Sequence, residues 1–249
     1  MNVLEGIRVV DLSTAYSAPI ATMQLADFGA DVIKVENTGK GDGSRTWNPM
    51  VDGEGIGFLY SNRNKRSVAL NLKSEEGKKA LFDLVKTADV VVENFRPGVC
   101  KKLGIDYEAM KAVKPDIIMA SLSGYGQTGP YAKKGAYSNL AEAQSGLMYI
   151  TGWPDGLPTG SGVAFGDSVA GMFLVQGIMF ALFHHQRTGE GQYIDVAMVD
   201  GLVALLQHAI VQYSLLGEEP ERIGNRDLSE YPYDTFAAKD GYCQLGNGT

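Results

Sequence analysis

Apolar runs and amphipathic stretches alternate along the first half of the chain. The apolar runs have the length of strands, and in the stretches between them apolar residues recur at helical spacing. On this pattern we predict strands at 7–13, 31–36, 66–72, 89–95 and 116–126, and helices at 18–29 and 74–88. Strands that alternate with helices are typical of an α/β fold. We expect a Rossmann-like, mainly parallel sheet with helices on both faces.

Capping residues mark the ends of these predicted helices. Pro19 falls in the first turn of one helix, and Gly29 stands where its C-terminal cap belongs. Ser74 precedes the other helix as a predicted N-cap, because its hydroxyl can accept a free backbone N–H.

The pattern changes after Ser168, where the residues are apolar nearly all round as far as 187–191. Such a stretch predicts a central buried helix, ended by a left-handed glycine. Next we predict a strand at 193–198 and a helix at 199–217. A polar loop at 218–234 and the start of a hairpin at 235–249 follow. We therefore expect a large domain over 1–217, and a linker and the start of a second domain over 218–249. On this interpretation a smaller C-terminal domain is largely absent and the chain is truncated.

Composition and charge narrow the function classes. The chain has 249 residues, 45% of them hydrophobic, and a formal net charge of −7. That sign disfavours nucleic acid as a partner, so an anionic ligand needs a local cationic pocket. The two cysteines are far apart and the three histidines form no cluster, so we expect no disulfide framework and no metal site. Without a signal-peptide pattern or about 18 consecutive apolar residues, we expect a cytoplasmic protein with no membrane partner.

The first strand–helix–strand unit resembles one of the two mononucleotide-binding halves of a dinucleotide-binding fold. Glu36 closes the second strand, where a ribose-binding acid stands in dinucleotide folds. However, the first turn reads STAYSAP and contains no glycine. Because the G-x-G-x-x-G turn lets the backbone approach a pyrophosphate, its absence disfavours NAD or FAD.

A second candidate ligand edge lies at Asn94, Phe95 and Arg96, just past the end of a predicted buried strand. Ligands bind at the carboxyl ends of strands in open α/β sheets. An amide, an aromatic ring and a guanidinium together suit a purine and phosphates. A solvated basic face is the alternative interpretation of these residues.

A lone carboxylate, Asp167, stands among small and apolar residues in GVAFGDSVAGMF. One interpretation is that Asp167 is the N-cap of a helix that begins at Ser168. The other is that Asp167 is a nucleophile, held ionised by the helix dipole and approached past its glycine neighbours. The two interpretations are compatible.

Blocks in order along nearly the whole chain resemble the family III CoA-transferases. This group includes formyl-CoA transferase and the carnitine and bile-acid CoA-transferases. The blocks include LEGIRVVDLSTAYSAPIATMQLADFGADVIKVE, NRNKRSVALNLKSEEGK, ADVVVENFRPGVCKKLGID, PTGSGVAFGDSVAGM and RTGEGQYIDVAM. Their order makes the resemblance more specific than any single motif.

The resemblance implies an acyl-CoA:carboxylate CoA-transferase with Asp167 as the nucleophile. An aspartyl anhydride and then an aspartyl-CoA thioester form before a carboxylic acid acceptor takes CoA. Coenzyme A and acyl-CoA are substrates, and no cofactor is bound permanently. The implied CoA contacts fall on the backbone around Tyr16, Ser17 and Ala18, on Leu70, Asn94, Phe95 and Lys102, and on Tyr137 beside the thioester.

The chain departs from formyl-CoA transferase at two positions. Tyr16 replaces a glutamine, which argues against formyl or oxalate substrates. Asn37 replaces an arginine, and Lys40 or Arg45 could supply the lost phosphate contact.

The resemblance also covers α-methylacyl-CoA racemases, which place a histidine where this chain has Ala136. A racemase needs an acid and a base on opposite faces of the α-carbon, so the alanine favours a transferase. A racemase and a truncated CoA-binding protein without activity remain the alternatives.

Two expectations concern the acyl pocket and the assembly. Tyr16, Met148, Tyr149 and Trp153 could line an apolar pocket for a larger acyl group, or could belong to ordinary core packing. Full-length members of the family form interlocked homodimers of ring-like protomers, so we expect a homodimer for a full-length form.

Overall fold

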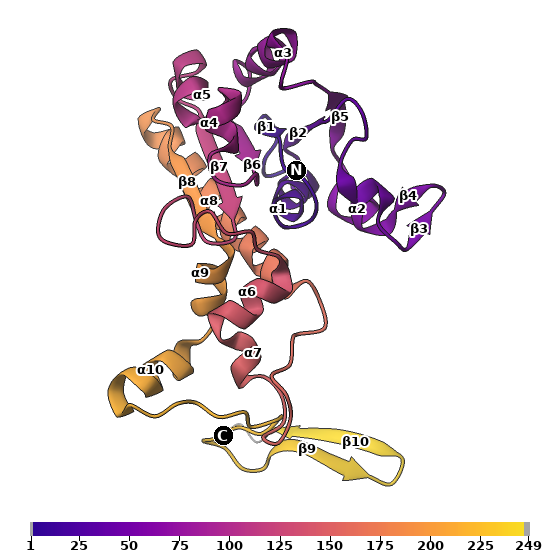
Figure 1. Cartoon of the computed structure of the whole chain (residues 1–249), viewed down its shortest axis with the longest axis vertical. Helices are drawn as coiled ribbons and strands as arrows, with labels where there is room; N and C mark the ends of the chain where they lie inside the picture. Colours follow the sequence, from indigo (N-terminus) through magenta and orange to yellow (C-terminus); the bar gives the residue numbers. More distant parts are fainter. Residues whose placement is uncertain (1, 247–249) are drawn as a thin grey trace.

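A six-stranded sheet forms the centre of the computed structural model, which describes residues 2–246 (Figure 1). The strand order is β5-β2-β1-β6-β7-β8, and every neighbouring pair is parallel. The strands are β1 Arg8–Asp11, β2 Asp31–Glu36, β5 Arg66–Ala69, β6 Val90–Glu93, β7 Ile118–Ser123 and β8 Tyr193–Ala197. The expected mainly parallel α/β sheet is confirmed.

Both faces of the sheet are covered because successive side chains of its central strands enter two different cores. Val9 packs into one hydrophobic cluster with α1 (Ser17–Asp27) and α8 (Phe165–Thr188). Val10 packs into the other, with α3 (Glu75–Val85), α4 (Val99–Leu103) and α5 (Tyr107–Val113). Both valines are fully buried, and burying such a side chain contributes roughly 1.5–3 kcal/mol.

Capping residues mark the ends of the helices that cover the sheet. Ser74 accepts the Gly77 N–H at 3.0 Å and is the N-cap of α3, as predicted. Gly29 has a φ of 101°, just after α1, and Gly189 has a φ of 75° at the end of α8. The short helices on the α3 face are α4 Val99–Leu103 and α5 Tyr107–Val113.

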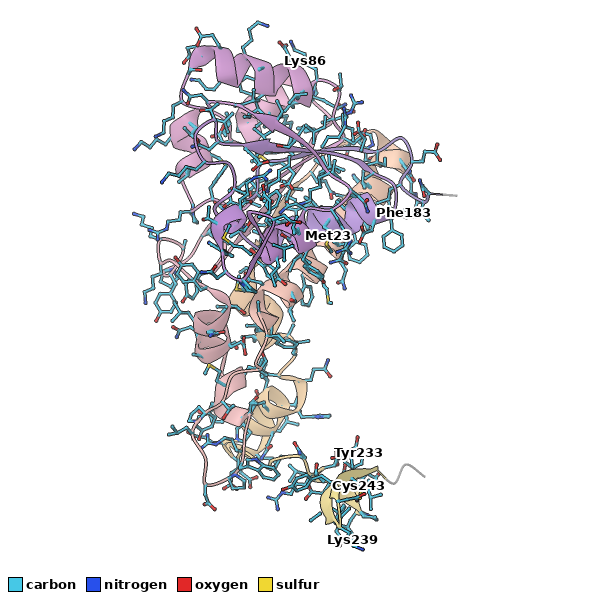
Figure 2. All side chains as sticks on the ribbon, turned by 90° about the vertical axis from the view of Figure 1, so that its right-hand side faces the viewer. Met23, Lys86, Phe183, Tyr233, Lys239 and Cys243 are labelled. Carbon is cyan, nitrogen blue, oxygen red and sulfur yellow. The ribbon has the colours of Figure 1, made fainter. Side chains whose placement is uncertain are left out.

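Helix α8 differs from its prediction at both its start and its surface. It begins at Phe165, three residues before the predicted start. It is not buried all round, because Met172, Phe180 and Phe183 are more than half exposed, and Phe183 points away from the ribbon (Figure 2). Its length and mean hydropathy of 1.5 would also suit a membrane span. Here α8 packs against α1 and β7 as a core helix.

The stretch at 199–217, predicted as one helix, is divided into α9 Met198–Val203 and α10 Gln207–Leu216. Near α9 lie α6 Ser138–Ser145 and α7 Leu147–Ile150, away from the sheet (Figure 1). The other small elements precede β5 and are η1 Gly43–Thr46, β3 Met50–Val51, β4 Glu54–Gly55 and α2 Ile56–Ser61.

The predicted C-terminal hairpin is present as β9 Tyr233–Ala238 and β10 Gly241–Gly246, and 247–249 lie outside the described residues. The loop before it returns to the end of α7. There the Gly224 N–H donates to the Gly152 carbonyl at 2.9 Å, and Arg222 donates to the Tyr149 carbonyl at 2.8 Å. The hairpin thus lies at the end of the molecule opposite α3 (Figure 1).

Candidate active site

A cavity of about 660 Å³ lies at the carboxyl ends of β1, β6 and β7. This is the edge of a parallel sheet where ligands bind. Seven residues singled out in the sequence line the cavity: Tyr16, Ser17, Asn94, Phe95, Arg96, Tyr137 and Asp167. The fold therefore brings the two candidate ligand edges and the lone carboxylate into one site.

Asp167 is the third residue of α8, and the N-cap position belongs to Ala164. The predicted N-cap role was therefore wrong, because the helix starts one turn earlier than its apolar pattern indicates. Gly166 allows this start: a Cβ there would lie 3.0 Å from the Ser138 carbonyl oxygen and 3.2 Å from the Met198 sulfur. The Gly166 N–H donates to the Ser138 hydroxyl at 2.9 Å, which joins the first turn of α8 to α6.

Burial controls the ionisation of Asp167. It raises the pKa of this carboxyl from 3.8 to about 6, although a hydrogen bond from Ser17 lowers the pKa and the charge of Glu142 raises it. This burial opposes the ionised form, which the helix start was expected to favour. At neutral pH the carboxylate is still the main form, and it is more basic than an exposed aspartate.

The turn after β1 carries Tyr16 and Ser17 to the cavity, and Asn94 holds this turn. The Asn94 side chain accepts the Thr14 N–H at 2.8 Å and donates to the Thr14 carbonyl at 2.8 Å. Asp42 accepts the N–H of Ala15, which has a left-handed φ of 67°. The sequence analysis expected a ligand contact from Asn94, and the structure gives its amide this bracing contact.

Two buried ion pairs lie beneath the same turn. Lys34 pairs with Asp42 at 2.8 Å and Lys65 pairs with Asp11 at 3.0 Å, all four with side chains at most 2% exposed. Lys34 also donates to the Ser13 carbonyl at 2.8 Å. This cluster was not predicted, although charged residues inside the apolar runs VVDLS and VIKVE were a visible signal of it.

Three residues named with the CoA contacts do not line the cavity. Ala18 is fully buried, Leu70 packs beside Phe95 against the second core cluster, and Lys102 is exposed on α4. Their roles stay predictions.

Arg45, one of the two residues considered for the lost phosphate contact, is already paired. Its guanidinium binds Glu36 at 2.7 Å and Glu54 at 3.0 Å. The hydrogen bond from Arg45 is the main reason that the pKa of Glu36 falls to about 2. Glu36, which stands where a dinucleotide fold places its ribose-binding acid, thus has a structural partner in this chain.

The apolar pocket expected from Tyr16, Met148, Tyr149 and Trp153 is not assembled. Tyr16 lines the cavity, but the other three are absent from its lining. Tyr149 and Trp153 instead contact the loop before the hairpin, through Arg222 and Gly224 respectively.

Other residues of the cavity wall were not predicted. Lys134 is one of them, and it joins the predicted Arg96 as the second cationic side chain in a wall whose one acid is Asp167. Trp47, Ile56 and Met198 add apolar surface. Only their distance in sequence from the other site residues concealed them, because the fold alone brings these segments together. Among residues 2–246 there is no group of three or more His, Cys, Asp or Glu side chains arranged to hold a metal.

Comparison with known proteins gives consistent results. The model of CoA-transferase family III matches residues 4–249. The chain is 46% identical to the acetyl-CoA:oxalate CoA-transferase of Acetobacter aceti, over 95% of this chain and 61% of that protein. It is 43% identical to the succinate–glutarate CoA-transferase of Agrobacterium fabrum, over 98% of this chain and 63% of that protein. The chain thus spans a little over three-fifths of the length of these curated relatives.

A solved structure shares the fold. A CaiB/BaiF family protein from Brucella suis superposes with a TM-score of 0.91 at 41% identity, over 96% of this chain and 65% of that one. The family match covers nearly all residues, and it includes the strand ends and the first turn of α8 that build the cavity. The chain belongs to CoA-transferase family III.

Proposed function

We propose that the protein is an acyl-CoA:carboxylate CoA-transferase with Asp167 as its nucleophile. The observation that carries this proposal is a single half-buried carboxylate in a cavity whose other charged groups are the cations Arg96 and Lys134. Such a wall attracts anionic substrates while it leaves one group able to form an ester-like bond.

The proposed reaction moves CoA from one carboxylic acid to another through covalent intermediates on Asp167, without a change of oxidation state. A carboxylate oxygen of Asp167 attacks the thioester carbonyl, the C–S bond breaks, and CoA thiolate leaves an acyl-aspartyl anhydride. The thiolate then attacks the aspartyl carbonyl carbon, and the first acid leaves as its carboxylate. An acceptor carboxylate attacks the resulting aspartyl-CoA thioester and releases thiolate again. The thiolate takes the acceptor's acyl group and restores the carboxylate of Asp167.

We place CoA along the edge formed by the turn at 14–18 and by Asn94, Phe95 and Arg96, with Tyr137 beside the thioester. Tyr137 is 76% exposed and lines the cavity, so its ring is available to a ligand. Leu70 and Lys102 are proposed contacts for the distal part of CoA, outside the cavity. No permanently bound cofactor is needed.

We further propose a dicarboxylate as acceptor or donor acid. The two curated relatives are described as acting on oxalate and on succinate and glutarate. Because Tyr16 argues against oxalate, the longer dicarboxylates are the proposed substrates of this chain. A second carboxylate on the substrate could pair with Arg96 or Lys134, since guanidinium and ammonium groups bind carboxylates well.

The test is to trap the enzyme-bound intermediate. After incubation with succinyl-CoA or acetyl-CoA, mass spectrometry should find CoA attached to the peptide that contains Asp167. Asp167→Asn should abolish this adduct while CoA still binds in calorimetry. As a matched control, Asp116→Asn removes an acid that pairs with Lys114 and His185 far from the cavity wall, and it should leave the adduct intact.

An adduct on another residue, or one that persists in Asp167→Asn, would contradict the mechanism. CoA binding without any adduct would favour the CoA-binding protein without activity. Loss of α-deuterium from a 2-methylacyl-CoA in the absence of an acceptor would favour the racemase.

The organisation of the whole protein follows as part of this proposal. We propose residues 1–217 as the large CoA-binding domain, 218–249 as a linker and the start of a second domain, and a cytoplasmic homodimer as the working form of the full-length protein. Exposed apolar side chains on α10, which include Leu215 and Leu216, support a partner surface.

A further inference from the structure

Behind the cavity, helix α6 carries a carboxylate that the proposed chemistry does not use. Glu142 is only 1% exposed. Its Oε2 accepts the Ser161 N–H at 3.0 Å, and its Oε1 lies 3.4 Å from the Ser138 hydroxyl. Within residues 2–246 neither lysine nor arginine pairs with this carboxylate.

The contacts of Glu142 reach both sides of the start of α8. Ser161 belongs to the loop that leads into the helix, and the Ser138 hydroxyl accepts the Gly166 N–H at 2.9 Å. Gly166 directly precedes Asp167. Glu142 therefore holds, through one side chain, the loop before the nucleophile and the turn that carries it.

The charged groups around Asp167 are few. Glu142 is the acid whose charge raises the pKa of Asp167. Tyr16, at the start of α1, is the other ionisable neighbour. Helix α9 has Asp200, which is exposed, and β8 has Asp195, which accepts the Gln127 N–H at 2.9 Å. Strand β7 has no ionisable side chain, and the cations Arg96 and Lys134 belong to the cavity wall.

We infer that Glu142 is a positioning residue for Asp167: it fixes the first turn of α8 through Ser138 and Ser161, and it places a second carboxylate behind the cavity wall. The catalytic meaning of this inference rests on the proposed function, because a more basic carboxylate is a better nucleophile toward a thioester. Burial and the charge of Glu142 act in the same direction on the pKa of Asp167.

Titration of Asp167 by carbon-13 NMR tests the inference without reference to turnover. The carboxyl signal, assigned with Asp167→Asn, should titrate near pH 6 in the parent protein. In Glu142→Gln, which keeps an acceptor for Ser161 but removes the charge, the midpoint should fall by at least about 0.5 unit. Asp116→Asn removes a remote charge and should leave the midpoint where it is.

An unchanged midpoint in Glu142→Gln, or an equal fall in Asp116→Asn, would overturn the inference. If Glu142→Gln does not fold, Glu142→Met takes its place, because it is similar in length and also removes the charge, so the Asp167 midpoint should fall in the same way. An unchanged midpoint in that variant would overturn the inference as well.

Kinetics supply the catalytic readout. The acid limb of the kcat/KM profile should move to lower pH in Glu142→Gln by the same amount as the NMR midpoint, and kcat above pH 8 should fall. If Glu142→Gln lowers the Asp167 midpoint but the parent protein forms no CoA adduct, the inference about Glu142 stands. The proposed transferase function would then be refuted instead.

Discussion

Asp167 combines two opposing demands in one side chain. It must be partly dehydrated to attack a thioester, and dehydration disfavours its ionised form. The pKa of Asp167 is raised to about 6 because burial disfavours its ionised form. A group held this way is expected to reduce stability in the pH range where it works.

We therefore predict that Asp167→Asn stabilises the fold at neutral pH. Between about pH 4 and 6 the folded protein keeps a proton that the unfolded chain has lost, so stability falls as pH rises through this window. Above it the parent protein should be less stable than the variant by up to about 3 kcal/mol. Urea unfolding at pH 5 and pH 7.5 measures the difference, which should widen with pH; a gap that stays constant would contradict the prediction.

At the scale of elements, the site depends on how the turn after β1 is held. Asn94 binds Thr14 from the end of β6, and Lys34 binds the Ser13 carbonyl from β2. Each contact crosses from one strand to another, so the turn is fixed by the sheet and not by its own sequence. A left-handed Ala15 is tolerated there because these contacts compensate for its strain.

We predict that Asn94→Asp loosens this turn. The carboxylate can still accept the Thr14 N–H, but it loses the donor to the Thr14 carbonyl and faces that oxygen with a charge. The free energy of unfolding should fall by about 1–3 kcal/mol, and KM for acyl-CoA should rise more than kcat falls.

Chemical denaturation and steady-state kinetics measure these two effects. Asn225→Asp, which also loses one donated hydrogen bond, at an exposed loop position outside the cavity wall, provides the matched control. Equal behaviour of the two variants would show that Asn94 does not brace the turn.

At the scale of the whole molecule, apolar surface is concentrated away from the sheet. Leu215 and Leu216 on α10 are 77% and 66% exposed, and Tyr231 and Tyr242 near and on the hairpin are more than 80% exposed. The hairpin projects from the end of the molecule (Figures 1 and 2). Exposed apolar side chains of this kind favour an interaction site at this end of the molecule.

We predict that the protein associates in solution through this end. Sedimentation should give a mass above the 26.8 kDa of one chain. Leu215→Lys should shift the protein toward the monomer, because it places a charge in the apolar surface. Lys86→Glu, on the exposed end of α3 at the other end of the molecule, should not. A parent protein that sediments as a monomer at all concentrations would contradict the prediction.

The sequence by itself determined the parallel α/β sheet, the helix caps at Ser74 and Gly189, and the presence of a lone acid near the start of α8. These features follow from hydrophobic period and local backbone chemistry, which act over a few residues. Only the tertiary structure decided the basicity of Asp167, the bracing role of Asn94 and the place of Glu142. These depend on burial and on contacts between distant residues, such as the 80 positions that separate Thr14 from Asn94. How much water a side chain loses depends on tertiary packing, so the local sequence pattern does not predict it.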